Sequence, residues 1–333
     1  MSIENRITPL KRLSGLRECI SRNGFARILE AHSGLSGLVV ENARAEVNGR
    51  VIEYDGIWES SLTDSATKGL PDASIVGNDS RAHTIDEILN VTTKPIIVDG
   101  DTGGEASQFE YMVKNLERLG VSAIIIEDKV FPKRNSLDGS ARQDLEDPVV
   151  FSERIRAGKE VVINDDFMII ARLESLIAGA GLADALDRAE QYIHAGVDGI
   201  MIHSSDKRPD DILAFAEAYK PLCQRLGRRP VLVCVPTTYN TITDAQLVDC
   251  GFNIIIHANH LLRSAYKAMN QAAMAILESG RSLEVDPLCA PVAEIFVTVG
   301  ADRINRKDRE RADSRRLIES ERNGAAAAPG QRR

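Results

Sequence analysis

Eight short apolar runs recur along this chain, and stretches with helical apolar spacing separate most of them. Their aliphatic composition is typical of parallel strands that are buried on both faces. A polar residue suited to chemistry follows nearly every run, and such residues gather where the carboxyl ends of barrel strands meet. The pattern predicts the α/β class, as a (β/α)8 TIM-type barrel. The predicted strands are residues 27–31, 56–59, 95–99, 123–127, 167–172, 199–203, 230–235 and 253–257.

The segments between and beyond these runs complete the predicted organisation. An N-terminal helix over residues 9–21 is expected to cap the barrel, and Asn48-Gly49 predicts a small hairpin within residues 44–54. Residues 61–82 are rich in Ser, Asp, Gly and Pro and predict a long loop, a type of segment that often binds ligands. Helical spacing predicts further helices over residues 105–119, 149–162, 181–195, 210–219, 244–250, 261–277 and 292–299.

The end of the chain differs in composition from the rest. Residues 1–304 are expected to form the barrel, whereas residues 305–333 are rich in Arg, Asp, Glu and Ala. A segment with so few apolar residues cannot bury a core of its own. We therefore expect a charged, disordered C-terminal tail over residues 305–333.

Charge, hydropathy and cysteine usage exclude several classes of protein. The net charge of −8 gives no indication of a nucleic-acid or membrane partner. No apolar stretch approaches the roughly 18 residues of a transmembrane helix, and the N-terminus lacks the apolar core of a secretory signal. The five cysteines are scattered and form no C-x-x-C pair. We expect a cytoplasmic protein with reduced thiols.

Carboxylates follow two neighbouring strands of the predicted barrel. Asp99 and Asp101 come at the end of the third run, and Glu127 ends the fourth. Neighbouring strands lie about 4.8 Å apart, so these side chains should converge. Asp-Gly-Asp alone also fits an Asx turn. Together with Glu127, however, it favours a divalent metal site, and oxygen ligands suit Mg²⁺ or Mn²⁺.

Two cationic or donor side chains end the next two strands. Arg172 follows a strongly apolar run, and a bidentate phosphate or carboxylate would suit its guanidinium group. The alternative for Arg172 is a structural ion pair with Glu174. His203 ends the next run, and its alternative is to lie in the core with its hydrogen-bonding groups paired. Residues 129–137 are basic, and they form either a solvated loop or a cover over an anionic substrate.

Longer motifs surround these residues. They are EAHSGLS at 30–36, GIWESSL at 56–62, DGDTG at 99–103, EDK at 127–129, PKRNSL at 132–137, AR at 171–172, HS at 203–204, VPT at 235–237 and ANH at 258–260. With these motifs in this order, residues 10–304 resemble the phosphoenolpyruvate mutase family of the isocitrate lyase/phosphoenolpyruvate mutase superfamily.

The motif at residues 133–137 distinguishes between members of the superfamily. Isocitrate and methylisocitrate lyases carry a catalytic cysteine there, within Lys-Lys/Arg-Cys-Gly-His. This chain has Lys133-Arg134-Asn135-Ser136-Leu137, so the acid for C–C cleavage is missing. Phosphonopyruvate hydrolases usually have threonine in place of Asn135. The resemblance therefore favours the mutase, although that choice depends on one residue.

The resemblance implies a reaction and its cofactor. The implied reaction is the interconversion of phosphoenolpyruvate and 3-phosphonopyruvate through a metaphosphate-like phosphoryl transfer, which forms a C–P bond and begins phosphonate biosynthesis. The equilibrium lies toward phosphoenolpyruvate, so a phosphonopyruvate decarboxylase or transaminase must consume the product. The implied ligands of Mg²⁺ are Asp99 directly and, through water, Asp72, Asp101 and Glu127.

The resemblance also assigns roles around the substrate. Trp58, Ser60, Ser61 and Leu62 would line the substrate pocket. The migrating phosphoryl group would be held by Arg172, His203, Asn135 and Ser136. Lys133 would arrive as its loop closes, and closure would exclude water, which would otherwise hydrolyse the intermediate.

Some residues depart from the family pattern. Gly100 stands where alanine is common, Glu59 and Ser61 replace glycines seen in some relatives, and His257 replaces a more usual aromatic residue. The family is typically tetrameric with a barrel helix exchanged between subunits, which implies a homotetramer that swaps residues 261–277. The alternatives are a phosphonopyruvate hydrolase, a 2-hydroxy-acid C–C lyase of the superfamily, or a barrel that binds a phosphorylated acid without turnover.

Overall fold

The computed structural model describes residues 2–326. The chain forms two compact units, of which one comprises Arg6–Asn270 and the other Met1–Asn5 together with Gln271–Arg333. The division falls within helix α10 (His260–Ser279). The domain boundary predicted at residue 304 stays a prediction. No helix of the described part of the chain is both long and apolar enough to cross a membrane.

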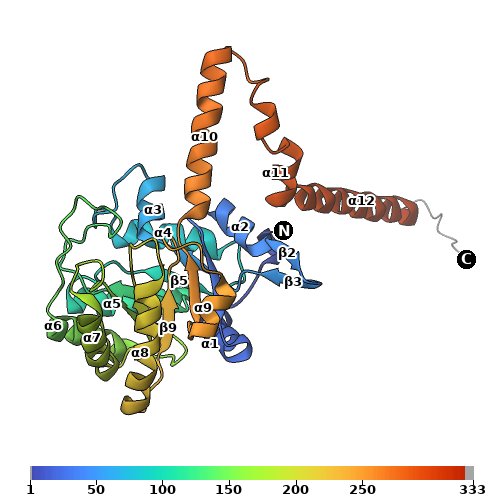
Figure 1. Ribbon diagram of the computed structural model, residues 1–333. Helices are drawn as coiled ribbons and strands as arrows, with labels where there is room; N and C mark the ends of the chain where they lie inside the picture. The colour runs from blue at the N-terminus through green and yellow to red at the C-terminus, as the bar shows by residue number, and fades with distance from the viewer. Residues whose placement is uncertain (1, 327–333) are drawn as a thin grey trace, which may run out of the picture. The chain divides into compact units, whose positions relative to one another are not determined.

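The first unit is built on a closed barrel of eight parallel strands (Figure 1). Strand β1 pairs with both β10 and β4, which closes the sheet. This arrangement confirms the predicted (β/α)8 barrel, and each of the eight predicted runs overlaps a strand. The strands are β1 (Ala26–Glu30), β4 (Gly56–Glu59), β5 (Ile96–Asp99), β6 (Ala123–Glu127), β7 (Met168–Leu173), β8 (Gly199–Ile202), β9 (Val231–Cys234) and β10 (Ile254–His257).

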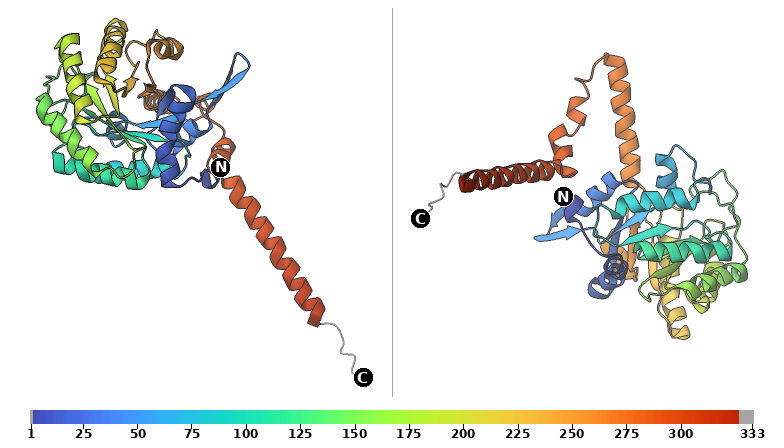
Figure 2. Two further views of the ribbon diagram at one scale, coloured as in Figure 1. Left: turned by 90° about the horizontal axis from the view of Figure 1, so that it is seen from below. Right: turned by 180° about the vertical axis from the view of Figure 1, so that it is seen from behind.

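Helices surround the strands of this barrel (Figure 2). Helix α1 begins with Pro9, and its N-cap Thr8 accepts a hydrogen bond from the Lys11 backbone N–H. The helices of this unit are α1 (Pro9–Asn23), α2 (Gly34–Asn42), α3 (Ser61–Thr67), α4 (Asn78–Leu89), α5 (Ala106–Leu119), α6 (Pro148–Val161), α7 (Gly181–Ala195), α8 (Asp210–Leu226), α9 (Asp244–Cys250) and the first half of α10.

The barrel has two apolar layers because successive strand residues point to opposite faces. Ile125 of β6 packs in the cluster that fills the barrel interior. Its neighbours Ile124 and Ile126 belong to the larger cluster beneath the helices. The same alternation along the other strands determines which polar side chains can reach the interior at the strand ends.

The predicted loop at residues 61–82 is wrong in part. Residues 61–67 form α3 and α4 begins at Asn78, which leaves only residues 68–77 as a connection. Small polar residues made this segment resemble a loop, but Thr63 and Asp64 are fully buried in α3. Packing against the barrel therefore outweighs the weak helix propensity of these residues.

The hairpin predicted around Asn48-Gly49 is present. Strands β2 (Arg44–Val47) and β3 (Arg50–Glu53) pair antiparallel. Asn48 and Gly49 have φ angles of 51° and 73°. Positive φ at both turn residues is what a two-residue hairpin of this kind requires.

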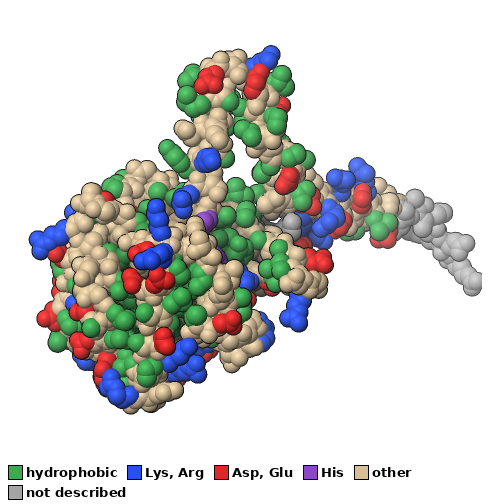
Figure 3. All heavy atoms as spheres, in the orientation of Figure 1, with side chains coloured by type: hydrophobic (Ala, Val, Ile, Leu, Met, Phe, Trp, Pro, Cys, Tyr) green, Lys and Arg blue, Asp and Glu red, His purple; other side chains and the backbone are tan. Residues whose placement is uncertain are grey.

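The second unit contains short 3₁₀ segments, the second half of α10, α11 (Val292–Thr298) and α12 (Ala301–Ala326). We expected disorder over residues 305–333, but residues 305–326 belong to α12, and the remainder of that prediction lies outside the described residues. Ion pairs three residues apart, such as Lys307 with Glu310 and Arg311 with Asp308, favour this helix. Apolar side chains are exposed on α10 and α11 (Figure 3).

Two glycines inside helices offer a matched test of the packing. A Cβ at Gly158 of α6 would lie 2.8 Å from Phe109 Cδ1 and 2.9 Å from Ile169 Cδ1, whereas one at Gly15 of α1 would meet nothing closer than 3.7 Å. We expect Gly158→Ala to lower the free energy of unfolding by about 1–3 kcal/mol through overpacking. Gly15→Ala should raise it by roughly 0.5–1 kcal/mol through helix propensity. Urea unfolding measures both changes, and equal effects would contradict this packing.

Candidate active site

Strand alternation brings the predicted polar residues to one end of the barrel. Trp58, Ile97, Ile125, Ile170 and Met201 all pack in the interior cluster. Because side chains two residues apart share a face, the residues that follow them by two point the same way. Those residues are Ser60, Asp99, Glu127, Arg172 and His203.

A small cavity of about 50 Å³ lies among these side chains. A volume of this size holds a few water molecules at most. Asp101 is the one predicted site residue that does not line the cavity. Those that line it are Trp58, Ser60, Ser61, Leu62, Asp72, Asp99, Glu127, Lys133, Asn135, Ser136, Arg172 and His203.

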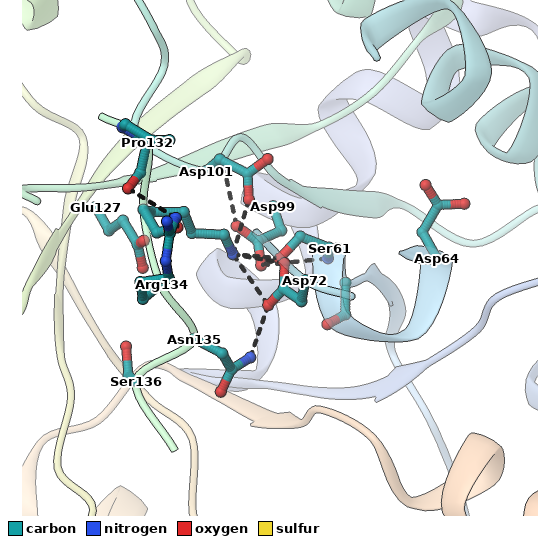
Figure 4. A network of polar contacts seen from close by, with 12 residues as sticks. Ser61, Asp64, Asp72, Asp99, Asp101, Glu127, Pro132, Arg134, Asn135 and Ser136 are labelled. Carbon is teal, nitrogen blue, oxygen red and sulfur yellow. Dashed lines mark hydrogen bonds and ion pairs between the residues drawn. The ribbon is translucent and has the colours of Figure 1, made fainter. Parts of the chain in front are cut away.

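On one side of the cavity, the Lys133 ammonium group lies among carboxylates. Figure 4 labels three of these acids, Asp72, Asp99 and Asp101. Lys133 Nζ is 2.9 Å from Asp72 Oδ1 and 2.8 Å from Asp101 Oδ1. It also donates to Ser61 Oγ at 2.8 Å, and Ser61 Oγ in turn donates to Asp99 Oδ2 at 2.8 Å. The Ser61 hydroxyl therefore connects the lysine to the carboxylate at the end of β5.

The pKa values reflect this grouping of charges. Burial alone would raise the pKa of Asp101, but Arg81 and Lys133 lower it to about 2. Burial alone would lower the pKa of Lys133, yet the charges of Asp101, Glu127, Asp99 and Asp72 raise it above its ordinary value. The four acids that the sequence predicts as metal ligands thus all act on the buried Lys133 ammonium group.

The donor chemistry of this acid group fits Mg²⁺ or Mn²⁺, since every candidate ligand is a carboxylate oxygen. Glu127 is buried, and its Oε1 accepts no hydrogen bond from the described residues. Burial raises the pKa of Glu127 to about 7 although Arg172 opposes the shift. Within residues 2–326, no three His, Cys, Asp or Glu side chains converge on a common point that could hold a metal ion.

The opposite side of the cavity carries cations and hydrogen-bond donors. Arg172 Nη2 donates to Ser136 Oγ at 2.8 Å and lies 2.9 Å from His203 Nδ1. Burial, followed by the Arg172 charge, lowers the pKa of His203, so its imidazole is neutral at pH 7. The ion pair between Arg172 and Glu174, which was the alternative for Arg172, is also present. Arg172 therefore has a structural partner and still faces the cavity.

Residues 128–147, which we call the covering loop, connect β6 to α6 and close over the cavity. Asn135 Nδ2 donates to Asp72 Oδ2 at 2.6 Å. Ser136 Oγ donates to Glu174 Oε2 at 2.6 Å on the other side. These bonds tie the loop to both sides of the site.

Three residues contribute to this site beyond those that the sequence assigned to it, although Glu174 was named as the ion-pair alternative for Arg172. Glu174 is fully buried and contacts Arg172, His203 and Lys129. Its position two residues beyond Arg172, on the same strand face, was the available signal. Lys129 was treated as part of a basic loop. Arg81, which contacts Asp101, was overlooked because its segment was predicted to be a loop.

Comparisons with known proteins agree with this geometry. The family model described as phosphoenolpyruvate phosphomutase matches residues 16–277. A phosphoenolpyruvate phosphomutase of Tetrahymena pyriformis is 34% identical over 93% of this chain and 98% of its own length. A phosphonopyruvate hydrolase of Variovorax sp. is 35% identical over 87% of this chain and 95% of its own.

Solved structures give the same result. The crystal structure of a phosphoenolpyruvate phosphomutase from Streptomyces platensis subsp. rosaceus has a TM-score of 0.81 and 36% identity, and the match covers 90% of this chain and 98% of that one. A phosphonopyruvate hydrolase in complex with oxalate and Mg²⁺ has a TM-score of 0.77 and 32% identity, covering 90% and 97%. The chain therefore belongs to the phosphoenolpyruvate phosphomutase family of enzymes, within the isocitrate lyase/phosphoenolpyruvate mutase superfamily.

Proposed function

We propose that this enzyme is a phosphoenolpyruvate mutase that interconverts phosphoenolpyruvate and 3-phosphonopyruvate. The observation that carries the proposal is the division of one covered cavity into two sides. Asp72 and Asp99 lie on the side of Lys133, and Arg172 and His203 lie on the other. Glu127 connects the two sides, because its Oε2 is 3.3 Å from Arg172 Nη2 and its charge acts on Lys133. An enolpyruvate bound near a cation on the first side would present its phosphoryl group to the second.

The chain's own residues account for the chemistry. From phosphoenolpyruvate to phosphonopyruvate, the bond between the enol oxygen and phosphorus breaks, and a bond between C3 and phosphorus forms. The atoms therefore balance without a co-reactant. Phosphoryl transfer has a loose transition state, and catalysis consists mainly of positioning and charge stabilisation. Arg172 would carry the phosphoryl charge, while neutral His203 and the Asn135 amide would orient its oxygens. The covering loop would exclude water, which would otherwise capture the transferred group.

Mg²⁺ is the cofactor that we propose for the acid side. Asp99 would bind it directly, and Asp72, Asp101 and Glu127 would bind it through water, an arrangement that does not need three side chains at one point. When bound, the ion would stabilise the negative charge of the carboxylate and enolate oxygens. Lys133, which now neutralises these acids, would have to share them with the ion.

Phosphorus NMR tests the reaction directly. With phosphonopyruvate and Mg²⁺, we expect the phosphonate signal to be replaced by that of phosphoenolpyruvate, and removal of the metal with EDTA should stop turnover. Asp99→Ala should lower kcat/KM by at least about 100-fold, because the bound charge contributes several kcal/mol. Asp187→Ala, at an exposed position on α7, should leave it unchanged. Cleavage of a 2-hydroxy acid without turnover of phosphonopyruvate would instead indicate a lyase.

The hydrolase alternative is favoured by the 35% identity to the Variovorax enzyme. Asn135→Thr would remove the amide that donates to Asp72. A hydrogen bond to a charged group is worth about 1.5–3 kcal/mol, so the loss should increase the ratio of pyruvate and phosphate to phosphoenolpyruvate about tenfold or more. Asn90→Thr, outside the site, should leave the product ratio unchanged. Pyruvate and phosphate as the main products of the unaltered enzyme would support the hydrolase.

We also propose that the enzyme is a homotetramer in which α10 is exchanged between subunits. None of the residues of α10 is buried, and Tyr266, Met269 and Leu277 expose large apolar side chains. Light scattering should give four times the 36.4 kDa mass of one chain. A single-chain mass at micromolar concentration would contradict this assembly.

A further inference from the structure

We propose that Arg81, on the outer side of the barrel, positions the turn that carries Asp99 and Asp101 for cation binding. The inference rests on the proposed function, since it concerns the same cation. Arg81 is a positioning residue, because it acts through the two acids and does not line the cavity.

The contacts of Arg81 join both ends of this turn. Its Nη1 donates to the backbone carbonyl of Asp99 at 2.5 Å, and its Nη2 donates to Asp101 Oδ2 at 3.1 Å. The side chain is buried, with 7% of the residue exposed. One planar guanidinium therefore fixes a main-chain oxygen of the first acid and a side-chain oxygen of the second.

A second set of residues restrains Arg81 on the side away from the turn. Asp64 is fully buried, points away from the cavity (Figure 4), and lies with its Oδ2 3.9 Å from Arg81 Nε. Asp64 pairs with Lys68 and accepts a hydrogen bond from Thr84 Oγ1 at 2.7 Å. Fixed partners on both sides leave the guanidinium little freedom to move, so it can transmit a defined position to the turn.

Glu59 gives Arg81 a further acidic neighbour. It is the last residue of β4 and has the outward orientation of Ile57, so it lies beneath the helices rather than in the cavity. It is fully buried, and neither carboxylate oxygen has a hydrogen-bond partner among the described residues. Arg81 therefore lies beside four acidic side chains, namely Glu59, Asp64, Asp99 and Asp101.

The turn itself needs support. Asp101 has a φ of 51°, a left-handed conformation that is unfavourable for residues other than glycine, although Asp and Asn tolerate it best. Within the turn, the Asp101 backbone N–H donates to Asp99 Oδ1 at 3.1 Å. Without Arg81, the Asp99 carbonyl and the Asp101 carboxylate would lose the group that connects them.

Two physical effects of removing Arg81 oppose each other. Arg81 is positive, so charge repulsion alone predicts that its loss strengthens cation binding at the acids. Positioning predicts the reverse, since groups that orient metal ligands typically contribute 10–100-fold in affinity. The direction of the change in affinity distinguishes the two roles.

The experiment compares Mn²⁺ binding by the intact protein and its variants without substrate. Free Mn²⁺ is measured by electron paramagnetic resonance, and the fluorescence of Trp58, the single tryptophan, at the cavity, provides a second signal. We expect Arg81→Met to weaken Mn²⁺ binding 10–100-fold. Arg81→Lys keeps the charge but loses the planar fork, and should fall between Arg81→Met and the unaltered protein.

Arg12→Met is the matched control. Arg12 is equally buried and donates to the backbone carbonyls of Leu89 and Thr92, outside the site. Its replacement should lower the stability but leave Mn²⁺ affinity unchanged. If Arg81→Met does not fold, Arg81→Lys decides alone: weaker binding than the unaltered protein supports positioning, and equal binding overturns it.

Unchanged or tighter Mn²⁺ binding in Arg81→Met would overturn the proposal, as would the absence of Mn²⁺ binding in the unaltered protein. Turnover of phosphonopyruvate by the unaltered protein is measured separately. Weakened Mn²⁺ binding in Arg81→Met without any such turnover would support the positioning role and reject the proposed reaction.

Discussion

The contact between Lys133 and the carboxylates joins closure of the covering loop to the charge balance of the site. An ammonium group buried without partners would cost several kcal/mol. Here Asp72 and Asp101 lie within 3 Å of it, and each of these acids gains a counter-ion. If the loop opened, Lys133 would leave with it and the acids would repel one another. The closed loop and the reduced repulsion among the acids therefore depend on the same contact, unless another cation takes the place of Lys133.

The cationic side is balanced in a comparable way by Glu174. This fully buried carboxylate pairs with Arg172, His203 and Lys129. Burial alone would raise the pKa of Glu174, but the Arg172 charge and the hydrogen bond with His203 lower it, so Glu174 remains ionised. Arg172 is thus held in place before any anion arrives. An incoming phosphoryl group would share Arg172 with Glu174 rather than order a free side chain, which reduces the entropic cost of binding.

The sequence predicted the barrel and most of the cavity because both follow from local pattern. Runs of buried aliphatic residues mark parallel strands, and a polar residue at an inward position, such as Arg172, must lie at the strand end. The contributors that it missed depend on contacts between distant segments. Arg81 joins α4 to the β5 turn, and Lys129 of the covering loop pairs with Glu174, which follows β7. The secondary structure of residues 61–67 and 305–326 was missed for a related reason, since polar composition does not exclude a helix that packing or ion pairs stabilise.

Two of the residues that depart from the expected family pattern, Gly100 and Ser61, lie beside the acids. At position 100, where alanine is common, a Cβ would lie 2.7 Å from Ile124 Cδ1 and 2.9 Å from Ile126 Cγ2, so the isoleucines occupy the space that glycine leaves. At position 61, serine adds a hydroxyl that donates to Asp99 and accepts from Lys133. With glycine at position 61, Asp99 and Lys133 would be connected only through the neighbouring carboxylates. The covering loop in this chain is therefore tied to the proposed metal ligand itself, and any ion that binds Asp99 must compete with Ser61 for one of its oxygens.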